Sequence, residues 1–385
     1  MGRSFARRGV GDGARSIRNR RIDGAHLGSS EDDAMTPDAP TTPLPYTPDE
    51  VAASLGSSWK ETLLDAVRWM ALGRALDSRM QSLQRQGRVG FYGAATGQEA
   101  VNVAAGLATS AEDWIFPGLR EQLVALVRGH DLVTYVHHLF GDALDPALGR
   151  NMPCHPSARE VHYVSMSSVI GTQVSQAAGL AYALRVRRDP GVAVAFFGDG
   201  ATSSNDFHAG MNFAGVFGLP VLFLCANNRW AISVPVERQT ATPTLAEKAR
   251  EYGLEGRRVD GTDFVAVYRA LAESLHRIRH GGPAEMIEFV LFRMNPHSSS
   301  DDPGRYQPDD WLARARATDP LDRLVLWLSE NGLVDGAAKG RTFSEADERV
   351  RAAVRIAEST PSPSPSTLTE GVFAPSLSTT TTETP

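Results

Sequence analysis

Two short polar motifs could build a metal-phosphate site. Gly198-Asp199-Gly200 and Asn227-Asn228 are separated by residues 201–226. A carboxylate and an amide supply the hard oxygen ligands that Mg²⁺ takes when it bridges a protein to phosphate. The two glycines permit close approach of a ligand and backbone conformations with φ > 0. Because a lone Gly-Asp-Gly also makes ordinary turns, the prediction depends on both motifs arriving at one place.

The segments around the motifs predict the β-α-β unit that would bring them together. Residues 192–197 form a continuous apolar run, typical of a strand buried on both faces. Residues 205–217 have an apolar helical face, Gly218-Leu219-Pro220 ends that helix, and residues 221–225 predict the next strand. Both motifs then fall at the carboxyl ends of strands, where open α/β sheets bind ligands. The N-terminus of the following helix would favour phosphate.

The rest of the chain continues the alternation of helices and strands. Residues 63–84 have helical apolar spacing. Residues 259–293 predict a turn at Asp260-Gly261, a helix near 264–280 and a strand over 285–293. This alternation predicts an α/β fold with a mainly parallel sheet flanked by helices. We expect one domain at residues 48–357.

Both ends of the chain have the composition of tails. Residues 1–47 are rich in Gly, Arg, Asp, Pro and Thr and are predicted to be disordered, and residues 358–385 form a Ser/Thr/Pro-rich tail. Residues 1–21 contain seven arginines and one acid, Asp12. We interpret them as a basic tail, which predicts a cytoplasmic bacterial protein. A transit peptide, and hence the mitochondrial matrix, is the alternative.

Composition excludes several classes of function. The net charge is −6, so no general attraction to nucleic acid or to an anionic membrane is expected. No apolar run approaches the roughly 20 residues that span a bilayer. The two cysteines, Cys154 and Cys225, cannot form a disulfide framework, which favours a reducing compartment. Cys154, His155 and His162 do not have the spacing of a zinc site. We expect the adjacent His137 and His138 to be surface or partner contacts.

The stretch 197–235, FGDGATSSNDFHAGMNFAGVFGLPVLFLCANNRWAISVP, identifies a family resemblance. It resembles the alpha subunit of the thiamine-diphosphate-dependent 2-oxoacid dehydrogenase decarboxylating component, of the branched-chain or the pyruvate type. The likeness covers about residues 55–375, including QRQGRVGFYGAATGQEA (84–100), DWIFPGLREQLVALVRG (113–129) and SSVIGTQVSQAAGLAYA (167–183). It implies the thiamine-diphosphate-binding fold with thiamine diphosphate and Mg²⁺ as cofactors, and a potassium ion as a further candidate.

The resemblance also implies the residues of the site. The cofactor-binding set is Arg120, Ser168, Ile170, Gly198, Asp199, Gly200, Ala201, Asn228 and His297. The Mg²⁺ ligands are Asp199, Asn228 and the carbonyl of Trp230. The candidate K⁺ ligands are Ser167, the carbonyl of Val169, Thr172 and Gln173.

His297 is the predicted catalytic residue. It lies in MIEFVLFRMNPHSSSDDPGRY (286–306), after the carboxyl end of a predicted strand. In the family, the matching histidine lies beside the thiazolium and helps the acyl group to transfer, and an imidazole suits such proton traffic near neutral pH. Two departures remove expected diphosphate contacts: Leu119 replaces a tyrosine and Ala226 replaces an arginine.

The activity implied is oxidative decarboxylation of a branched-chain 2-oxoacid, of the 3-methyl-2-oxobutanoate dehydrogenase type, with acyl transfer to a lipoyl group. The resemblance implies that a beta subunit completes the site in an α2β2 assembly, which docks a lipoyl acyltransferase core. Residues 368–374 match the segment that contacts partners. Two alternatives remain open. One is a pyruvate or acetoin dehydrogenase alpha subunit, and the other is a degenerate, non-catalytic partner protein.

Overall fold

The computed structural model describes residues 41–298 and 300–370. The α-helices are α1 Pro48–Leu55, α2 Trp59–Arg85, α3 Glu99–Ala108, α4 Gln122–Val127, α5 Leu132–Phe140, α6 Thr172–Arg187, α7 Asn205–Phe217, α8 Phe264–Arg279, α9 Trp311–Ala317, α10 Pro320–Glu330 and α11 Ala338–Ser359. The strands are β1 Trp114–Phe116, β2 Ala193–Gly198, β3 Val221–Asn227, β4 Trp230–Ala231, β5 Val234–Pro235, β6 Glu255–Asp260 and β7 Glu285–Val290. The 3-10 helices used below are η3 Asp199–Ser203 and η7 Pro365–Thr369.

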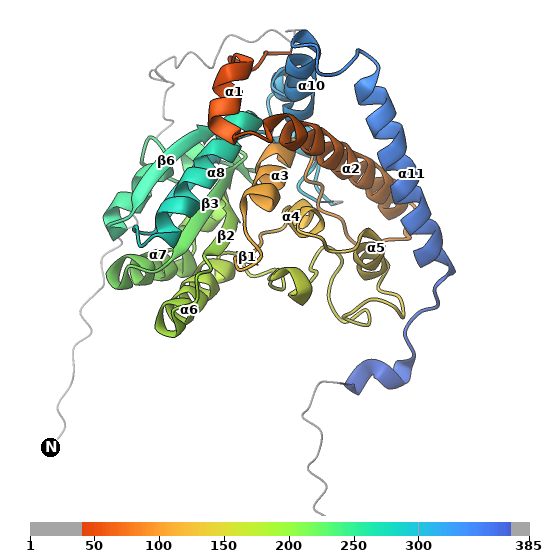
Figure 1. Cartoon of the computed structure of the whole chain (residues 1–385). Coiled ribbons are helices and arrows are strands. Elements are labelled where there is room, and N and C mark those ends of the chain that lie inside the picture. Colours follow the sequence, from red (N-terminus) through yellow and green to blue (C-terminus); the bar gives the residue numbers. More distant parts are fainter. Residues whose placement is uncertain (1–40, 299, 371–385) are drawn as a thin grey trace, which may run out of the picture. The chain divides into compact units, whose positions relative to one another are not determined.

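A parallel sheet forms the centre of the fold (Figure 1). Its strand order is β1-β2-β3-β7-β6, and each neighbouring pair is parallel. Because every strand runs in the same direction, the carboxyl ends of all five lie along one edge. The short strands β4 and β5 form a separate antiparallel pair in the loop after β3.

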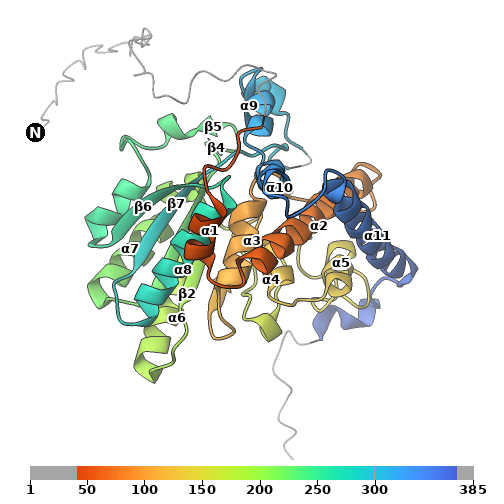
Figure 2. The same ribbon diagram turned by 45° about the horizontal axis from the view of Figure 1, so that its top comes forward.

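Side chains of the central strands alternate between two apolar cores, as the period of a strand requires. In β2, Val194 and Phe196 pack in the core that includes buried residues of α2, α3, α8, α10 and α11. Ala195 and Phe197 face the other way, into the core formed with α6 and α7. Figure 2 shows these two groups of helices on opposite faces of the sheet. The predicted α/β architecture with helices on both faces is therefore confirmed.

The elements expected around the two motifs are present with small shifts. Helix α7 has the predicted bounds; Ser204 caps it by accepting from the Phe207 amide, and Gly218 ends it in a left-handed conformation. The 3-10 helix η3, which was not predicted, intervenes between β2 and α7 and contains Asp199 and Gly200 of the Gly-Asp-Gly motif. Strands β1 and β6 have no counterpart among the elements predicted from the sequence. The polar strand β6 lies at the sheet edge and pairs with β7 alone, so it has no buried apolar run to reveal it.

The residues just before α1 pack against the domain. Leu44 is buried, Tyr46 donates its hydroxyl to Asp263, and the carbonyl of Tyr46 accepts from the indole of Trp327 at 2.7 Å. These contacts place the start of the folded part before Pro48, earlier than the predicted boundary at residue 47. The disorder expected for residues 1–40 lies outside the described residues, as does most of the C-terminal tail, including residues 371–374 of the predicted partner-contacting segment.

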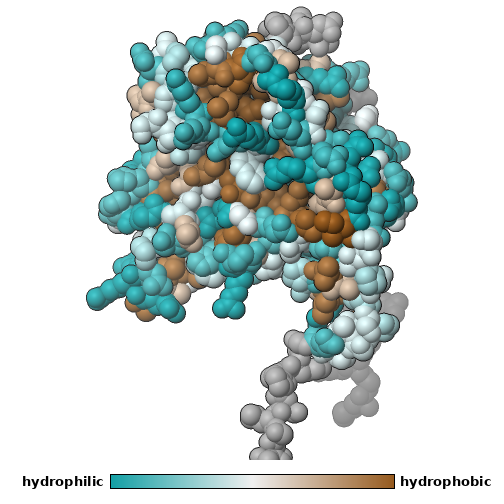
Figure 3. All heavy atoms as spheres, turned by 45° about the vertical axis from the view of Figure 1, so that its right-hand side comes forward, coloured by the Kyte–Doolittle hydropathy of each residue, from teal (hydrophilic) through white to brown (hydrophobic). Residues whose placement is uncertain are grey.

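Figure 3 shows one face of the molecule, on which hydrophobic residues gather in patches between hydrophilic ones. Exposed large apolar side chains on the C-terminal elements are Phe343 and Ile356 of α11 and Leu368 of η7. Across residues 41–298 and 300–370, no helix is both long enough and apolar enough to cross a membrane.

Candidate active site

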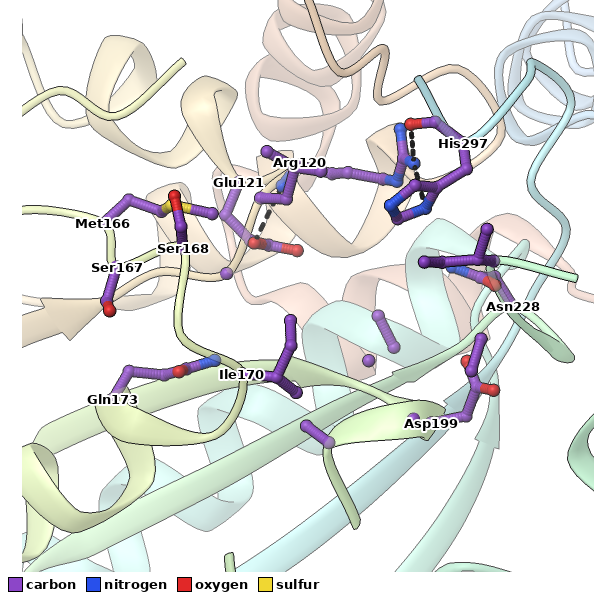
Figure 4. A pocket seen from close by; sticks show the side chains of 18 of the residues that line it. Arg120, Glu121, Met166, Ser167, Ser168, Ile170, Gln173, Asp199, Asn228 and His297 are labelled. Atoms are coloured by element: carbon purple, nitrogen blue, oxygen red, sulfur yellow. Dashed lines mark hydrogen bonds between the residues drawn. The ribbon is translucent and has the colours of Figure 1, made fainter. Parts of the chain in front are cut away.

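A cavity of about 410 Å³ opens at the carboxyl edge of the sheet. Residues at or after the carboxyl ends of four neighbouring strands line it: Gly118–Glu121 after β1, Gly198–Ala201 at the end of β2, Asn228 after β3 and His297 after β7. The cavity lining includes every residue of the predicted cofactor-binding set: Arg120, Ser168, Ile170, Gly198, Asp199, Gly200, Ala201, Asn228 and His297. Figure 4 shows Asp199 and Asn228 on one side of this space and Ser168 on the other, with Arg120 beside His297.

Asp199 is a buried acid in the cavity wall. Its side chain accepts a hydrogen bond of 2.8 Å from the Gln239 amide, and burial raises its pKa to about 6. Asp199 forms no ion pair with another residue in the described part of the chain. Burying a carboxylate without a cationic partner is costly, so the position favours a bound cation. Asn228 lies nearby at the end of β3, where its side-chain oxygen accepts from the Trp230 amide at 3.3 Å.

The two glycines beside Asp199 have different roles. Both are described, and neither has positive φ, so the expectation of special backbone conformations is wrong. At Gly200 a Cβ atom would come within 2.7 Å of the Ala231 Cβ atom, whereas at Gly198 a Cβ would meet nothing within 4 Å. The close approach of the β4 strand, rather than a left-handed turn, requires glycine at 200.

The carbonyl of Trp230, a predicted Mg²⁺ ligand, has a partner that the sequence analysis missed. The buried guanidinium of Arg293 donates to the Trp230 carbonyl at 3.0 Å and to the Ile232 carbonyl at 2.8 Å. Arg293 also donates to the Tyr306 hydroxyl, which in turn donates to Asp301. Arg293 therefore ties the loop after β3 to the loop that carries His297. One lone pair of the Trp230 carbonyl remains for another contact.

His297 is held on both sides. Its backbone amide donates to Asp301 at 2.7 Å, and its carbonyl accepts from Arg120 at 2.7 Å. The same Arg120 nitrogen lies 3.3 Å from Nδ1 of the ring. Arginine can only donate, so Nδ1 is the acceptor and the proton of the neutral ring is on Nε2. Burial, followed by the charges of Arg120 and Arg293, lowers the pKa of His297 to about 4.

The predicted potassium ligands lie in the turn before α6 and in the first two residues of that helix. The Ser167 hydroxyl accepts from the Val169 amide at 3.1 Å, and the Thr172 hydroxyl donates to the Val169 carbonyl at 3.0 Å. Gln173 points its amide nitrogen to the Phe196 carbonyl at 2.8 Å. Ser167 and Gln173 line the cavity, whereas Val169 and Thr172 do not. The four residues lie together in the chain, but in two different environments.

Further cavity residues lie outside the predicted cofactor-binding set. Leu119 and Ala226, the two departures from the family pattern, both line the cavity. Glu121 does so as well, and burial raises its pKa to about 7. His155, set aside because its spacing fits no zinc site, is buried and also lines the cavity. Within the described residues, no group of three or more His, Cys, Asp or Glu side chains could hold a metal ion.

The expectation for His137 and His138 is wrong, because both are buried. Their exposed fractions are 4% and 3%. Adjacent helical side chains diverge, and each ring finds its own acid after the end of α5: His137 lies 2.6 Å from Asp142, and His138 lies 3.2 Å from Asp145. The pairing of each ring with an acid makes burial of two neighbouring polar side chains possible.

The fold and the cavity define a parallel α/β protein with a phosphate- and cation-compatible site at the carboxyl ends of its strands. Residues 67–366 match the model of the dehydrogenase E1 component family, and the chain belongs to this family. It is 39% identical over 292 residues to the 2-oxoisovalerate dehydrogenase subunit alpha 2, mitochondrial, of Arabidopsis thaliana, covering 75% of this chain and 61% of that protein. The chain thus spans less than two thirds of that relative's length.

Two bacterial relatives match over a larger share of their length. The 2-oxoisovalerate dehydrogenase subunit alpha of Bacillus subtilis is 36% identical over 323 residues, which are 83% of this chain and 98% of the relative. The pyruvate dehydrogenase E1 component subunit alpha of Bacillus cereus is 38% identical over 302 residues, covering 78% and 79%. Relatives named for a branched-chain substrate and for pyruvate are therefore similar to this chain to nearly the same degree.

Proposed function

We propose that this chain is the alpha subunit of a thiamine-diphosphate-dependent 2-oxoacid dehydrogenase that acts on a branched-chain 2-oxoacid. The observation that carries the proposal is the cavity at the carboxyl ends of adjacent parallel strands, which gathers Asp199, Asn228 and His297. Membership of the E1 component family supports it. So do the names of the Arabidopsis thaliana and Bacillus subtilis relatives, both 2-oxoisovalerate dehydrogenase alpha subunits.

The residues of the cavity fit Mg²⁺ and a diphosphate. Asp199 is a buried carboxylate whose pKa burial raises to about 6, and a divalent cation would supply the missing positive partner. The side-chain oxygen of Asn228 and the carbonyl of Trp230 are further oxygen donors of the kind that Mg²⁺ prefers. At Gly198, which also lines the cavity, an added Cβ would meet nothing within 4 Å, so open space remains beside this backbone. Arg120, with a guanidinium suited to phosphate, lines the same space.

The bound cofactor would supply the electron sink on which a 2-oxoacid loses CO₂. The protein would bind, orient and exclude water. His297 is neutral near pH 7, since its pKa is about 4, and Arg120 leaves the proton on Nε2. His297 can therefore donate a hydrogen bond from Nε2 to an oxygen of the reacting group. Arg293, through the loop contacts described above, fixes the distance between that imidazole and the metal end of the cavity.

A beta subunit would complete the site. Apolar side chains at the cavity are exposed in this chain alone: Met152 by 49%, Ile170 by 62% and Ile232 by 53%. Apolar surface of this kind around a polar cavity is typical of a site that a second protein covers. We propose that a beta subunit contributes the glutamate that activates the aminopyrimidine, in an α2β2 assembly. A lipoyl acyltransferase core would receive the acyl group. A potassium ion in the turn 167–173 belongs to the same proposal.

The proposal is tested by co-expressing the chain with a candidate beta subunit from the same genome. Calorimetry should detect thiamine diphosphate binding that depends on Mg²⁺. The complex should decarboxylate 3-methyl-2-oxobutanoate faster than pyruvate with an artificial electron acceptor. Faster turnover of pyruvate would assign the chain to the pyruvate type instead. Failure to bind the cofactor would favour a degenerate, partner-binding protein, for which Leu119 and Ala226 at the cavity are the motivation.

A further inference from the structure

Ser168 and His155 form a hydrogen-bonded pair in the cavity wall. The Ser168 Oγ atom lies 2.6 Å from Nε2 of His155, and both residues line the cavity. Ser168 lies across the space from Asp199 and Asn228 (Figure 4). The lining on this side includes the apolar Met166 and Ile170, together with the polar Ser167, Gln173 and Glu121. This side of the cavity thus combines apolar surface with polar groups, among which the Ser168 hydroxyl is polarised by His155.

The hydrogen bonds of His155 determine which atom of the pair donates. Nδ1 of His155 lies 2.9 Å from the carbonyl of Pro153. A carbonyl can only accept, so Nδ1 carries the ring proton and Nε2 of the neutral ring is an acceptor. The Ser168 hydroxyl must therefore donate to His155. Its oxygen then presents only lone pairs to the cavity, which makes Ser168 a hydrogen-bond acceptor there.

The rest of the structure fixes His155 in this orientation. Its backbone amide donates to Nε2 of His138 at 3.2 Å, and its carbonyl accepts from the Asn151 side chain at 3.2 Å. His138 is in turn oriented by Asp145. Cys154, the residue before His155, adopts a φ of 64°, which is unfavourable for a residue other than glycine. Strained backbone of this kind is found where the surroundings hold a side chain in a required position.

We propose that His155 is a positioning residue that makes the Ser168 hydroxyl an acceptor for an N–H donor on a flat heteroaromatic ring bound in the cavity. The proposal rests on the proposed function, in which this donor is the amino group of the aminopyrimidine ring. The apolar neighbours of Ser168 suit the faces and edges of such a ring, and the oriented Ser168 acceptor suits one amino group. His155 itself acts through Ser168.

The experiment uses the complex with the beta subunit and two probes in the presence of Mg²⁺. The probes are thiamine diphosphate and its analogue in which oxygen replaces the ring amino group. Their affinities are measured by calorimetry, and the preference is the ratio of the two. The variants are Ser168→Ala, His155→Asn, His155→Gln and the double variant Ser168→Ala/His155→Asn. His137→Phe is the control, since this buried histidine is paired with Asp142 and does not line the cavity.

Ser168→Ala and His155→Asn should each lower the preference roughly two- to tenfold, the range for one neutral hydrogen bond. Asparagine can still reach the Pro153 carbonyl but is too short to reach Ser168, whereas glutamine places an oxygen near the position of Nε2. His155→Gln should therefore retain the preference. The double variant should lose no more than either single variant, because both changes remove one interaction. His137→Phe should leave the preference unchanged.

Additive losses in the double variant would overturn the proposal. The proposal would also be overturned if His155→Asn left the preference unchanged while Ser168→Ala reduced it. Equal losses in His155→Asn and His155→Gln would also overturn it, because they would indicate a structural role. Circular dichroism of each complex separates these results from loss of folding. Because the asparagine and glutamine side chains differ by only one methylene, His155→Asn and His155→Gln are a closely matched pair. Absence of Mg²⁺-dependent cofactor binding by the wild-type complex would instead overturn the proposed function.

Discussion

His297→Ala should separate acyl transfer from decarboxylation. The ring of His297 lies on a different loop from Asp199 and Asn228, so the complex should still bind cofactor. A positioned acid or base is worth roughly 10²–10⁴-fold in rate, and acylation of a lipoyl domain should fall by an amount in this range. Decarboxylation with an artificial electron acceptor should fall less, because the electron sink belongs to the cofactor. The control is His130→Ala, a buried histidine paired with Glu160 that does not line the cavity.

The pH dependence gives a second measure of the same residue. With a pKa of about 4, lowered by burial and then by Arg120 and Arg293, His297 is protonated in roughly one molecule in a thousand at pH 7. The lipoyl-acylation rate should therefore keep its His297 contribution down to about pH 5 and lose it near pH 4. Folding opposes protonation of this ring, so wild type should lose stability relative to His297→Ala as the pH falls from 6.5 to about 4. Unchanged lipoyl acylation in a folded His297→Ala complex, or a transition near pH 6.5 that this variant abolishes, would refute the reasoning.

Three further predictions concern the cofactor, the partner and the N-terminus. In the assembled complex, Asp199→Ala should abolish Mg²⁺-dependent binding of thiamine diphosphate, because it removes a charged ligand. Asn228→Ala should only weaken this binding, because it removes a neutral ligand. Unchanged calorimetric affinity for Asp199→Ala would show that the metal assignment is wrong. The isolated chain should bind the cofactor poorly and release no CO₂ from any 2-oxoacid, and robust turnover without a beta subunit would contradict the half-site. Deleting residues 1–40 should leave the urea midpoint of the complex unchanged. Deleting residues 1–47 should also remove the buried Leu44 and the Tyr46 contacts, and so lower the free energy of unfolding by about 2 kcal/mol. Equal stability of the two truncations would argue against that packing.

The central β-α-β unit could be predicted from the sequence because its signals are local. An apolar run, a helical apolar face and the Gly218-Leu219-Pro220 stop gave β2, α7 and β3 within a few residues. The same locality explains the misses. Strand β6 is polar because it lies at the sheet edge, and η3 is a short turn that only the capping of α7 by Ser204 reveals. Neither feature has an apolar pattern of its own.

The resemblance to relatives supplied the residue set, and the tertiary structure arranged it. Arg120, Ser168 and His297 are separated by up to 177 positions, and no local pattern connects them. Their meeting depends on the order in which parallel strands pair, which places the loops after β1, β2, β3 and β7 along one edge. The partners Arg293 and Gln239 likewise became visible only through their contacts with the predicted residues.

The sequence by itself determined the fold class and the chemistry available at the two motifs, since residue types and periodicity set both. Only the tertiary structure decided the protonation pattern. Arg120 leaves the proton of His297 on Nε2, while the Pro153 carbonyl leaves that of His155 on Nδ1. The two imidazoles are chemically identical in the sequence. They differ in the folded chain because one contacts a group that can only donate and the other a group that can only accept.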